Sequence, residues 1–412
     1  MVLQEMVSAS FESIALQDAK TKSTVLHMIC ASNSPTFLAQ GIRAVLSTGR
    51  TLQEGAVACL CDMDGRNPLH VLLENPYCTS SVLRSFLTNF GDGDLCTAME
   101  TVDSQGRLPL HVLAASCCTS DVLTSLLQQL KHYITAETVA LQDAKELSAL
   151  HYTIDMVDAV AFEILASKNP DGVCTVADGS GLTCLHRACS SFTLKPFLIA
   201  AIMQHCSESA MLSTDEGLTA LHMLARRDSR TMAAERLECV QAITAKCAEA
   251  VAIQVQNRTG QSQQRWPDNT VVHDVCAAPF VDEQFLSALL GPAPKAGEVI
   301  NLAGYTPLQV LIQRTDLRDD LERLVEHFTE LSPNSVRVGG CDKAGRALDS
   351  IPKRFNSMPT AFHMLCERKD ATVGLVKALG RGAHQAAMVQ DAVSIELYAD
   401  LDPAACCSVI TP

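Results

Sequence analysis

Aromatic residues and long hydrophobic runs are scarce in this sequence. Of 412 residues only 4% are aromatic, with a single tryptophan. A core poor in aromatic side chains suits closely stacked helices. No uninterrupted apolar run reaches the ~18 residues that a membrane-crossing helix needs, so we expect no membrane span.

Basic residues are outnumbered, because 32 Lys and Arg stand against 46 Asp and Glu, a formal net charge of −14. Nucleic-acid binding needs a basic stripe that displaces counterions, so this balance argues against a nucleic-acid partner. The acidic surface would favour basic partner segments, or it could serve solubility alone. The phosphate-binding signatures GxxxxGK[ST] and GxGxxG are also missing, and we expect no cofactor.

A targeting signal is a further absence. Residues 1–16 contain Glu5 and Glu12 and no basic start, so a signal peptide is not expected. The chain has 18 cysteines, which without a signal peptide indicates reduced thiols rather than a disulfide framework. We therefore expect an intracellular, cytoplasmic location, with the nucleus as an open alternative.

What the sequence does contain is one stretch that returns along most of its length. In its clearest form it runs from Asp103 through Gly106 and Pro109 to Leu110 and His111. Gly106 can adopt the positive φ of a tight turn, and Pro109 suits the first turn of a helix, where its missing N–H is no loss. This stretch, called the box below, predicts a turn that leads into a helix.

The box recurs with a constant capping position. Its copies end at His27, His70, His111, His151, His186, His222, His273, Gln309 and His363. Three residues earlier, every copy except that of Leu108 has a residue type favoured at helix N-termini: Thr24, Asn67, Ser148, Thr183, Thr219, Thr270, Thr306 and Thr360. A side-chain oxygen there accepts a hydrogen bond from an early helix N–H, worth about 0.5–2 kcal/mol.

The box resembles the Thr-Pro-Leu-His motif of the ankyrin repeat, which opens the first of two helices after a β-turn. The resemblance covers roughly residues 17–380 and implies about nine units. It implies an all-α fold, an ankyrin-type α-solenoid of helix-turn-helix repeats with short turns or β-hairpin-like tips. Successive histidines are mostly separated by more than the ~33 residues of the standard unit, so longer helices or inter-helix turns are expected.

The same reading divides the chain into five parts. They are an N-terminal capping segment at 1–16, ankyrin-like repeats 1–6 at 17–253, a polar insertion at 254–269, repeats 7–9 at 270–382 with an insertion at 342–359, and a degenerate C-terminal cap and tail at 383–412.

Histidine and cysteine could also indicate chemistry. The box histidines could be ligands or bases, but repeat spacing keeps them apart, and we expect each imidazole to tie adjacent turns by hydrogen bonds. His27 and Cys30 have the i, i+3 spacing of two zinc ligands, without a second pair to complete four. Cys117 and Cys118 have no neighbouring base or positive charge to activate a thiolate. We assign no metal ligand and no catalytic residue.

In ankyrin-like arrays the turn tips and exposed positions of the first helices form a concave face that usually binds proteins. By position, the resemblance assigns to this face Met63, Asp64, Arg66, Glu74, Asn75, Ser104, Gln105, Arg107, Ser116, Lys145, Asp155, Met156, Ser180, Leu182, Ser190, Ser191, Glu216, Leu218, Arg226, Arg227, Tyr305, Gln313 and Arg314. Trp266 is a further candidate anchor in the polar insertion, or it could instead pin that loop onto the repeats.

These features predict a non-enzymatic scaffold or adaptor that binds a protein partner through the concave face. The chain would be a monomer or a subunit of a hetero-complex. Two alternatives remain open: an architectural subunit of a larger assembly, and a cysteine-dependent enzyme built on the array.

Overall fold

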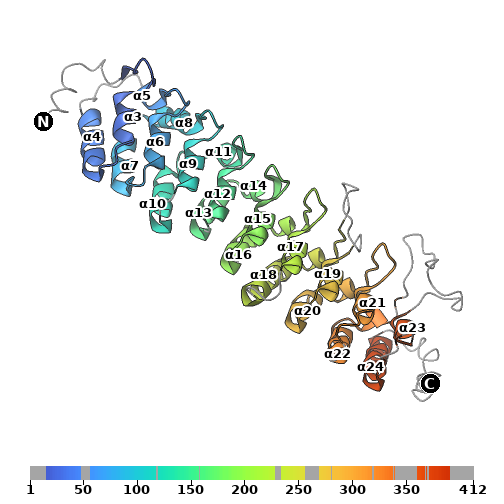
Figure 1. The fold of residues 1–412 in the computed structure, drawn as a ribbon. Helices are drawn as coiled ribbons and strands as arrows, with labels where there is room; N and C mark the ends of the chain where they lie inside the picture. Colours follow the sequence, from blue (N-terminus) through green and yellow to red (C-terminus); the bar gives the residue numbers. More distant parts are fainter. Residues whose placement is uncertain are drawn as a thin grey trace. The chain divides into compact units, whose positions relative to one another are not determined.

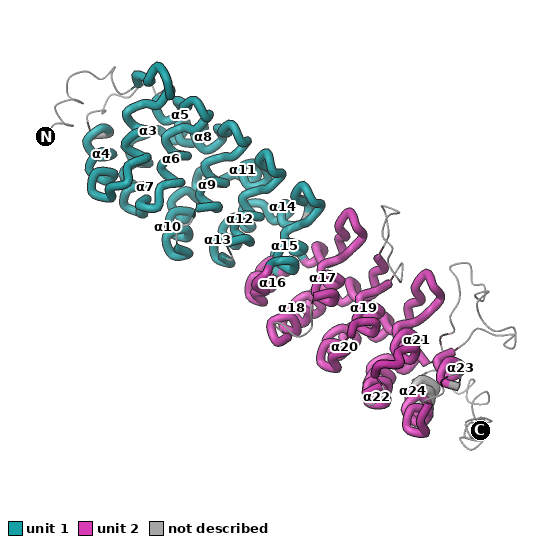
Figure 2. The backbone as a smooth tube through the Cα atoms, viewed as in Figure 1, with its two compact units in different colours: residues 1–191, 204–206 teal, residues 192–203, 207–412 magenta. Residues whose placement is uncertain are grey.

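The structure is a computed structural model in which helices are joined by turns and loops (Figure 1). The described residues are 15–47, 56–116, 119–156, 158–227, 233–255, 269–279, 281–317, 320–336, 338, 360–366, 368 and 371–389. Within them the β-structure consists of three isolated bridges beside the turns. The predicted all-α fold is confirmed. Two compact units, residues 1–191 with 204–206 (unit 1) and residues 192–203 with 207–412 (unit 2), are coloured separately in Figure 2.

Unit 1 is built from repeats of an inner helix that follows the box and a longer outer helix. Its inner helices are α3 (Val25–Cys30), α6 (Pro68–Glu74), α9 (Pro109–Ala115), α12 (Ala149–Asp155) and α15 (Cys184–Ser190). Its outer helices are α4 (Pro35–Ser47), α7 (Ser80–Leu87), α10 (Ser120–Leu130) and α13 (Ala159–Ala166). Inner helices pack on inner helices and outer helices on outer helices. Sequential helix pairs of this kind are the ankyrin-type architecture.

A third, short helix in each repeat explains the long period. In unit 1 these helices are α5 (Ala56–Cys59), α8 (Asp92–Glu100), α11 (Ala136–Ala140) and α14 (Pro170–Thr175). They follow the outer helix and form a row of their own in Figure 1, with α5 packed on α8 and α11 on α14. The sequence predicted longer helices or turns, and the structure instead places the extra residues in this additional element.

Unit 2 repeats the plan with 3₁₀ helices in the third row. Its inner helices are α17 (Ala220–Arg226), α19 (Val271–Ala277), α21 (Pro307–Ile312) and α23 (Ala361–Cys366). The outer helices are α16 (Pro196–His205), α18 (Ala233–Lys246), α20 (Glu283–Leu290), α22 (Leu321–Leu331) and α24 (Val373–Val389), although the last residues of α16 belong to unit 1. The third row is η1 (Ser207–Met211), η2 (Ala248–Ala252), η3 (Pro294–Glu298) and η4 (Pro333–Val336).

The box leucine belongs to the buried core of the inner helices of unit 1. Leu26, Leu69, Leu110 and Leu150 are all fully buried, at 0% exposure. In unit 2 the same position holds the buried Val272 in α19 and the half-buried Phe362 in α23. Burial of one leucine side chain contributes about 1.5–3 kcal/mol, so the recurring box supplies a repeated source of stability.

Several predicted segments lie wholly or partly outside the described residues. The capping segment at 1–16 is described only from residue 15, and the insertion at 342–359 not at all. The insertion at 254–269 is described at its two ends, where the Val255 N–H donates to the Asn269 carbonyl at 2.9 Å. Its ends therefore meet at the base of a turn. At the C-terminus α24 continues to Val389, past the boundary predicted at 382.

None of the helices in the described part of the chain is long and apolar enough to cross a membrane.

Candidate interaction surface

Four turns of unit 1 are fixed by an aspartate that is almost fully buried: Asp62, Asp103, Asp143 and Asp178. In the second turn of unit 1, Asp62 is 7% exposed, and its Oδ1 accepts from the N–H groups of Asp64 and Arg66, each at 2.9 Å. The turn closes through Gly65, whose φ of 74° lies in the left-handed region that favours glycine. In the next turn, Asp103 Oδ1 accepts the corresponding bonds from the N–H groups of Gln105 and Arg107. Gly106 closes this turn with a φ of 72°, as the sequence predicted.

Neighbouring turns are joined to one another through the backbone. The Ser104 N–H donates to the Asp64 carbonyl at 2.8 Å, and the Ala144 N–H donates to the Gln105 carbonyl at 2.8 Å. Gln142 adds a side-chain bond from its Nε2 to the Ala177 carbonyl at 2.6 Å. The turn tips of unit 1 are thus a rigid row rather than independent loops.

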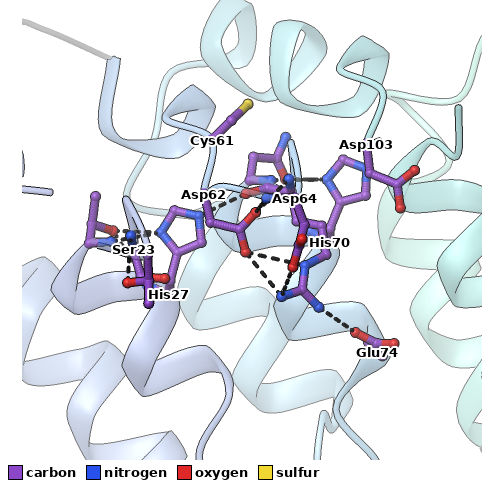
Figure 3. Close-up of polar contacts among 12 residues, drawn as sticks. Ser23, His27, Cys61, Asp62, Asp64, His70, Glu74 and Asp103 are labelled. Carbon is purple, nitrogen blue, oxygen red and sulfur yellow. Dashed lines mark hydrogen bonds and ion pairs between the residues drawn. The ribbon is translucent and has the colours of Figure 1, made fainter. Parts of the chain in front are cut away.

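Five of the described box histidines join their inner helix to the turn that follows it, whereas the Nε2 of His151 is buried without a hydrogen-bond partner. His70 Nδ1 accepts from the Asn67 N–H at 3.2 Å, and its Nε2 donates to the Arg107 carbonyl at 3.0 Å. His27 makes the corresponding bonds to Thr24 and to the Arg66 carbonyl. Figure 3 shows both rings between adjacent turns. The prediction that the imidazoles tie adjacent turns is confirmed at these positions, and likewise at His111, His222 and His273.

Burial sets the charge state of these rings. It is the main cause that lowers the pKa of His70 to about 4, against smaller opposing effects of the Arg107 carbonyl and Asp103. The neutral ring is also the form that the hydrogen bonds require, because Nδ1 must accept. A neutral ring without a free lone pair is neither a base nor a ligand.

Most of the residues predicted to contact a partner are solvent-accessible. Exposed side chains are those of Met63, Asp64, Glu74, Ser104, Gln105, Lys145, Asp155, Met156, Ser180 and Ser190 in unit 1, and Glu216, Arg226 and Gln313 in unit 2. Half-buried ones are those of Arg66, Arg107, Ser116, Leu182, Ser191, Leu218, Arg227, Tyr305 and Arg314. Trp266 lies outside the described residues.

The predicted arginines are engaged inside the chain. The Arg66 guanidinium pairs with Asp62 at 3.1 Å, Asp64 at 3.2 Å and Glu74 at 3.5 Å. Arg107 pairs with Asp103 at 2.9 Å. These ion pairs hold the turns, and the assignment of Arg66 and Arg107 to a partner-binding surface stays a prediction.

The structure corrects the assignment of Asn75, five residues after the box histidine His70, to the exposed face. Asn75 occupies it in the second repeat of unit 1, where it is 8% exposed rather than available to a partner. Its Nδ2 donates to the carbonyls of Cys30 and Ser32, at 2.7 and 2.9 Å, at the end of the preceding inner helix. Carbonyls at a helix C-terminus have no partner within the helix, and Asn75 supplies one from the next repeat.

Arginine performs this task at the corresponding position in unit 2. Arg314 donates to the carbonyls of Cys276 and Ala278 after α19, and Arg368 donates to those of Ile312 and Arg314 itself. Arg368 was not singled out from the sequence. The sequence could have indicated it, because Arg368 lies five residues after the box histidine His363, just as Arg314 lies five residues after Gln309.

The inner helices also carry an ion pair that the sequence did not reveal. Arg187, the residue after the box histidine in α15, donates through Nε and Nη2 to both carboxylate oxygens of Asp155, at 2.8 and 2.7 Å. Its Nη1 reaches Asp178 at 2.7 Å. The bidentate geometry fixes adjacent inner helices, and it engages the Asp155 carboxylate that was predicted to face a partner.

Buried thiols offer little reactivity, whereas Cys96 is exposed. Burial raises the pKa of Cys184 to about 12 and that of Cys30 still further. Cys206 is disulfide-bonded, which departs from the expectation of reduced thiols. Among the described residues no group of three or more His, Cys, Asp or Glu side chains is placed to hold a metal ion.

No protein-family model and no curated protein matches this sequence. Among the solved structures that are similar to part of it are the following two. The ankyrin repeat domain of Bcl-3, a member of the IkappaB protein family, has 16% identity and a TM-score of 0.34, with 50% of this chain and 95% of that chain covered. A structure of the predatory endopeptidase Bd0816 from Bdellovibrio bacteriovorus with its immunity protein Bd3460 has 14% identity and a TM-score of 0.38, with 54% and 98% covered.

These similarities are too distant to add to the argument, which stands on the geometry of the chain itself. Capped box helices and outer helices that pack in sequence recur in both units. The chain has the architecture of an ankyrin repeat array, in which a third short helix follows every described outer helix except α24.

Proposed function

We propose that this chain is a non-enzymatic scaffold or adaptor that binds a protein partner through the turn tips of unit 1. The tip surface is defined here as Met63, Asp64, Ser104, Gln105, Lys145 and Ser180. The observation that carries the proposal is the bonding between successive turns, through the backbone as far as Ala144 and through the Gln142 side chain to Ala177, which presents these exposed side chains in one row. Rigid presentation lowers the entropic cost of binding.

The chemistry of the tip surface indicates the kind of contact. Met63 is 65% exposed, and its flexible thioether side chain adapts to apolar partner surfaces. Gln105 and Ser104 offer uncharged donors and acceptors, while Lys145 adds one charge. Because Arg66 and Arg107 are paired internally, we expect partner binding to depend weakly on salt concentration.

The test is affinity capture followed by mass spectrometry with a tip variant, Met63→Ala/Gln105→Ala/Lys145→Ala. A control variant, Arg84→Ala/Gln128→Ala, removes exposed side chains from the outer helices α7 and α10. We expect the tip variant to lose partners that the control keeps, at unchanged melting temperature. Identical partner sets for wild type and both variants would contradict the proposal.

The captured complexes also test whether the chain is an architectural subunit of a larger assembly. A chain that is an obligate subunit would form a stoichiometric complex with its partner on size-exclusion chromatography, and an adaptor would exchange partners. We propose an intracellular location because ten of the described cysteines are free thiols, although Cys206 is disulfide-bonded, and cell fractionation with thiol labelling tests it.

A further inference from the structure

Three successive boxes of unit 2 place different side chains in the same buried position. His222, His273 and Gln309 are each 0% exposed. They begin the inner helices α17, α19 and α21, and each bridges its own helix N-terminus and a carbonyl later in the chain.

The two histidines bind as neutral rings. His222 Nδ1 accepts from the Thr219 N–H at 3.4 Å and faces the Thr219 hydroxyl at 2.7 Å, while its Nε2 donates to the Asn269 carbonyl at 3.2 Å. His273 repeats this with the Thr270 N–H at 3.1 Å and the Tyr305 carbonyl at 2.9 Å.

Gln309 makes the same pair of bonds without a titratable group. Its Oε1 accepts from the Thr306 N–H at 2.8 Å, and its Nε2 donates to the Val338 carbonyl at 3.3 Å. Glutamine therefore fits this buried position and reproduces both polarities of the imidazole.

Protonation of the imidazole would turn its Nδ1 from a hydrogen-bond acceptor into a donor. The protonated ring carries an N–H at both nitrogens, so Nδ1 would point a donor at the donor N–H of Thr219 or Thr270. The helix N-terminus would lose its acceptor, and a buried N–H without a partner is costly. Gln309 cannot undergo this change.

Nearby charges do not remove the conflict. The Asp274 carboxylate on α19 raises the pKa of both rings, and Arg226 on α17 lowers that of His222. His222 lowers the pKa of His273. The other elements that pack against these helices, α18, η2, α20 and α21, bring no described charged side chain to bear on either ring.

We propose that unit 2 contains an acid-sensitive joint: protonation of His222 and His273 releases α17 and α19 from the turns that follow them, whereas α21, held by Gln309, stays closed. Mild acid would thus loosen part of this unit and leave the adjacent repeat intact.

The direction and size of the effect follow from the two charge states. Burial lowers the pKa of His222 and of His273 to about 4 in the closed form, whereas an exposed histidine titrates near 6.5. The open form therefore takes up protons first, and the closed form loses stability as the pH falls from about 6.5 towards 4. For one ring, the open-to-closed ratio increases roughly tenfold between pH 7 and pH 5.5.

Hydrogen exchange measured by mass spectrometry on the full chain at pH 7 and pH 5.5, corrected for intrinsic rates, tests this joint. We expect exchange in peptides covering α17 and α19 to accelerate roughly tenfold at pH 5.5, with no acceleration in α21. Equal acceleration in all three helices, or in none, would overturn the proposal.

Two variants make the assignment specific. His222→Gln/His273→Gln keeps the hydrogen bonds that Gln309 demonstrates and should abolish the acid effect at α17 and α19. Gln309→His should transfer acid sensitivity to α21. Acid-accelerated exchange of α17 that persists in the double glutamine variant would show that other groups are responsible and would sink the idea.

Discussion

Removing the Arg107 side chain tests whether the predicted partner arginines serve the fold. The sequence places Arg107 on the partner-binding face, so its replacement would reduce binding without affecting stability. In the structure its Nε and Nη2 both lie 2.9 Å from Asp103 Oδ2. We expect Arg107→Ala to destabilise unit 1.

Exposure decides the magnitude of that loss. The side chain of Asp103 is 1% exposed and that of Arg107 is 21% exposed. Fully exposed ion pairs contribute about 0–1 kcal/mol, and breaking a fully buried pair costs about 3–5 kcal/mol. Asp103 keeps two backbone donors at its Oδ1, which limits the penalty. We expect a loss of about 2 kcal/mol, intermediate between those cases.

Urea unfolding followed by circular dichroism measures this loss, with Gln105→Ala as the matched control. Gln105 lies two residues away on the same turn tip and is exposed, so its truncation should change stability by no more than about 0.5 kcal/mol. A double-mutant cycle with Asp103→Asn isolates the pair. If Arg107→Ala lowered the free energy of unfolding no more than Gln105→Ala, the conclusion that Arg107 stabilises the fold would be refuted.

Three further outcomes follow from single side chains. Leu110→Ala should cost about 2–5 kcal/mol in urea unfolding because it leaves a cavity at a 0% exposed position; a loss below about 1 kcal/mol would contradict its burial. Glu146→Gly should raise stability by about 0.5–1 kcal/mol, because Glu146 has a φ of 59° at a position where other turns have glycine. An unchanged urea midpoint would argue against backbone strain at Glu146. A thiol reagent at pH 8 should label exposed Cys96 well before Cys30, whose pKa burial raises; equal rates would show that α3 opens readily.

The sequence by itself determined the repeat and its starting points. Thr24, Asn67 and Thr306 cap their helices as predicted, because a cap involves residues only three positions apart and leaves a local signature. The left-handed turn at Gly106 was predictable for the same reason. These features identify an ankyrin-type array without any knowledge of what lies beside each repeat.

Only the tertiary structure decided which polar side chains remain available to a partner. Asn75 and Arg187 have the residue types of a binding surface, yet their partners Cys30 and Asp155 lie 45 and 32 positions away. Such bonds depend on how consecutive repeats stack, and local composition carries no record of that register. The short third helices, among them α5 and α11, escaped prediction because so few residues show no period of their own. The packing between repeats decides which polar side chains are engaged within the fold and which stay at the surface. The box makes this packing possible but does not specify its contacts.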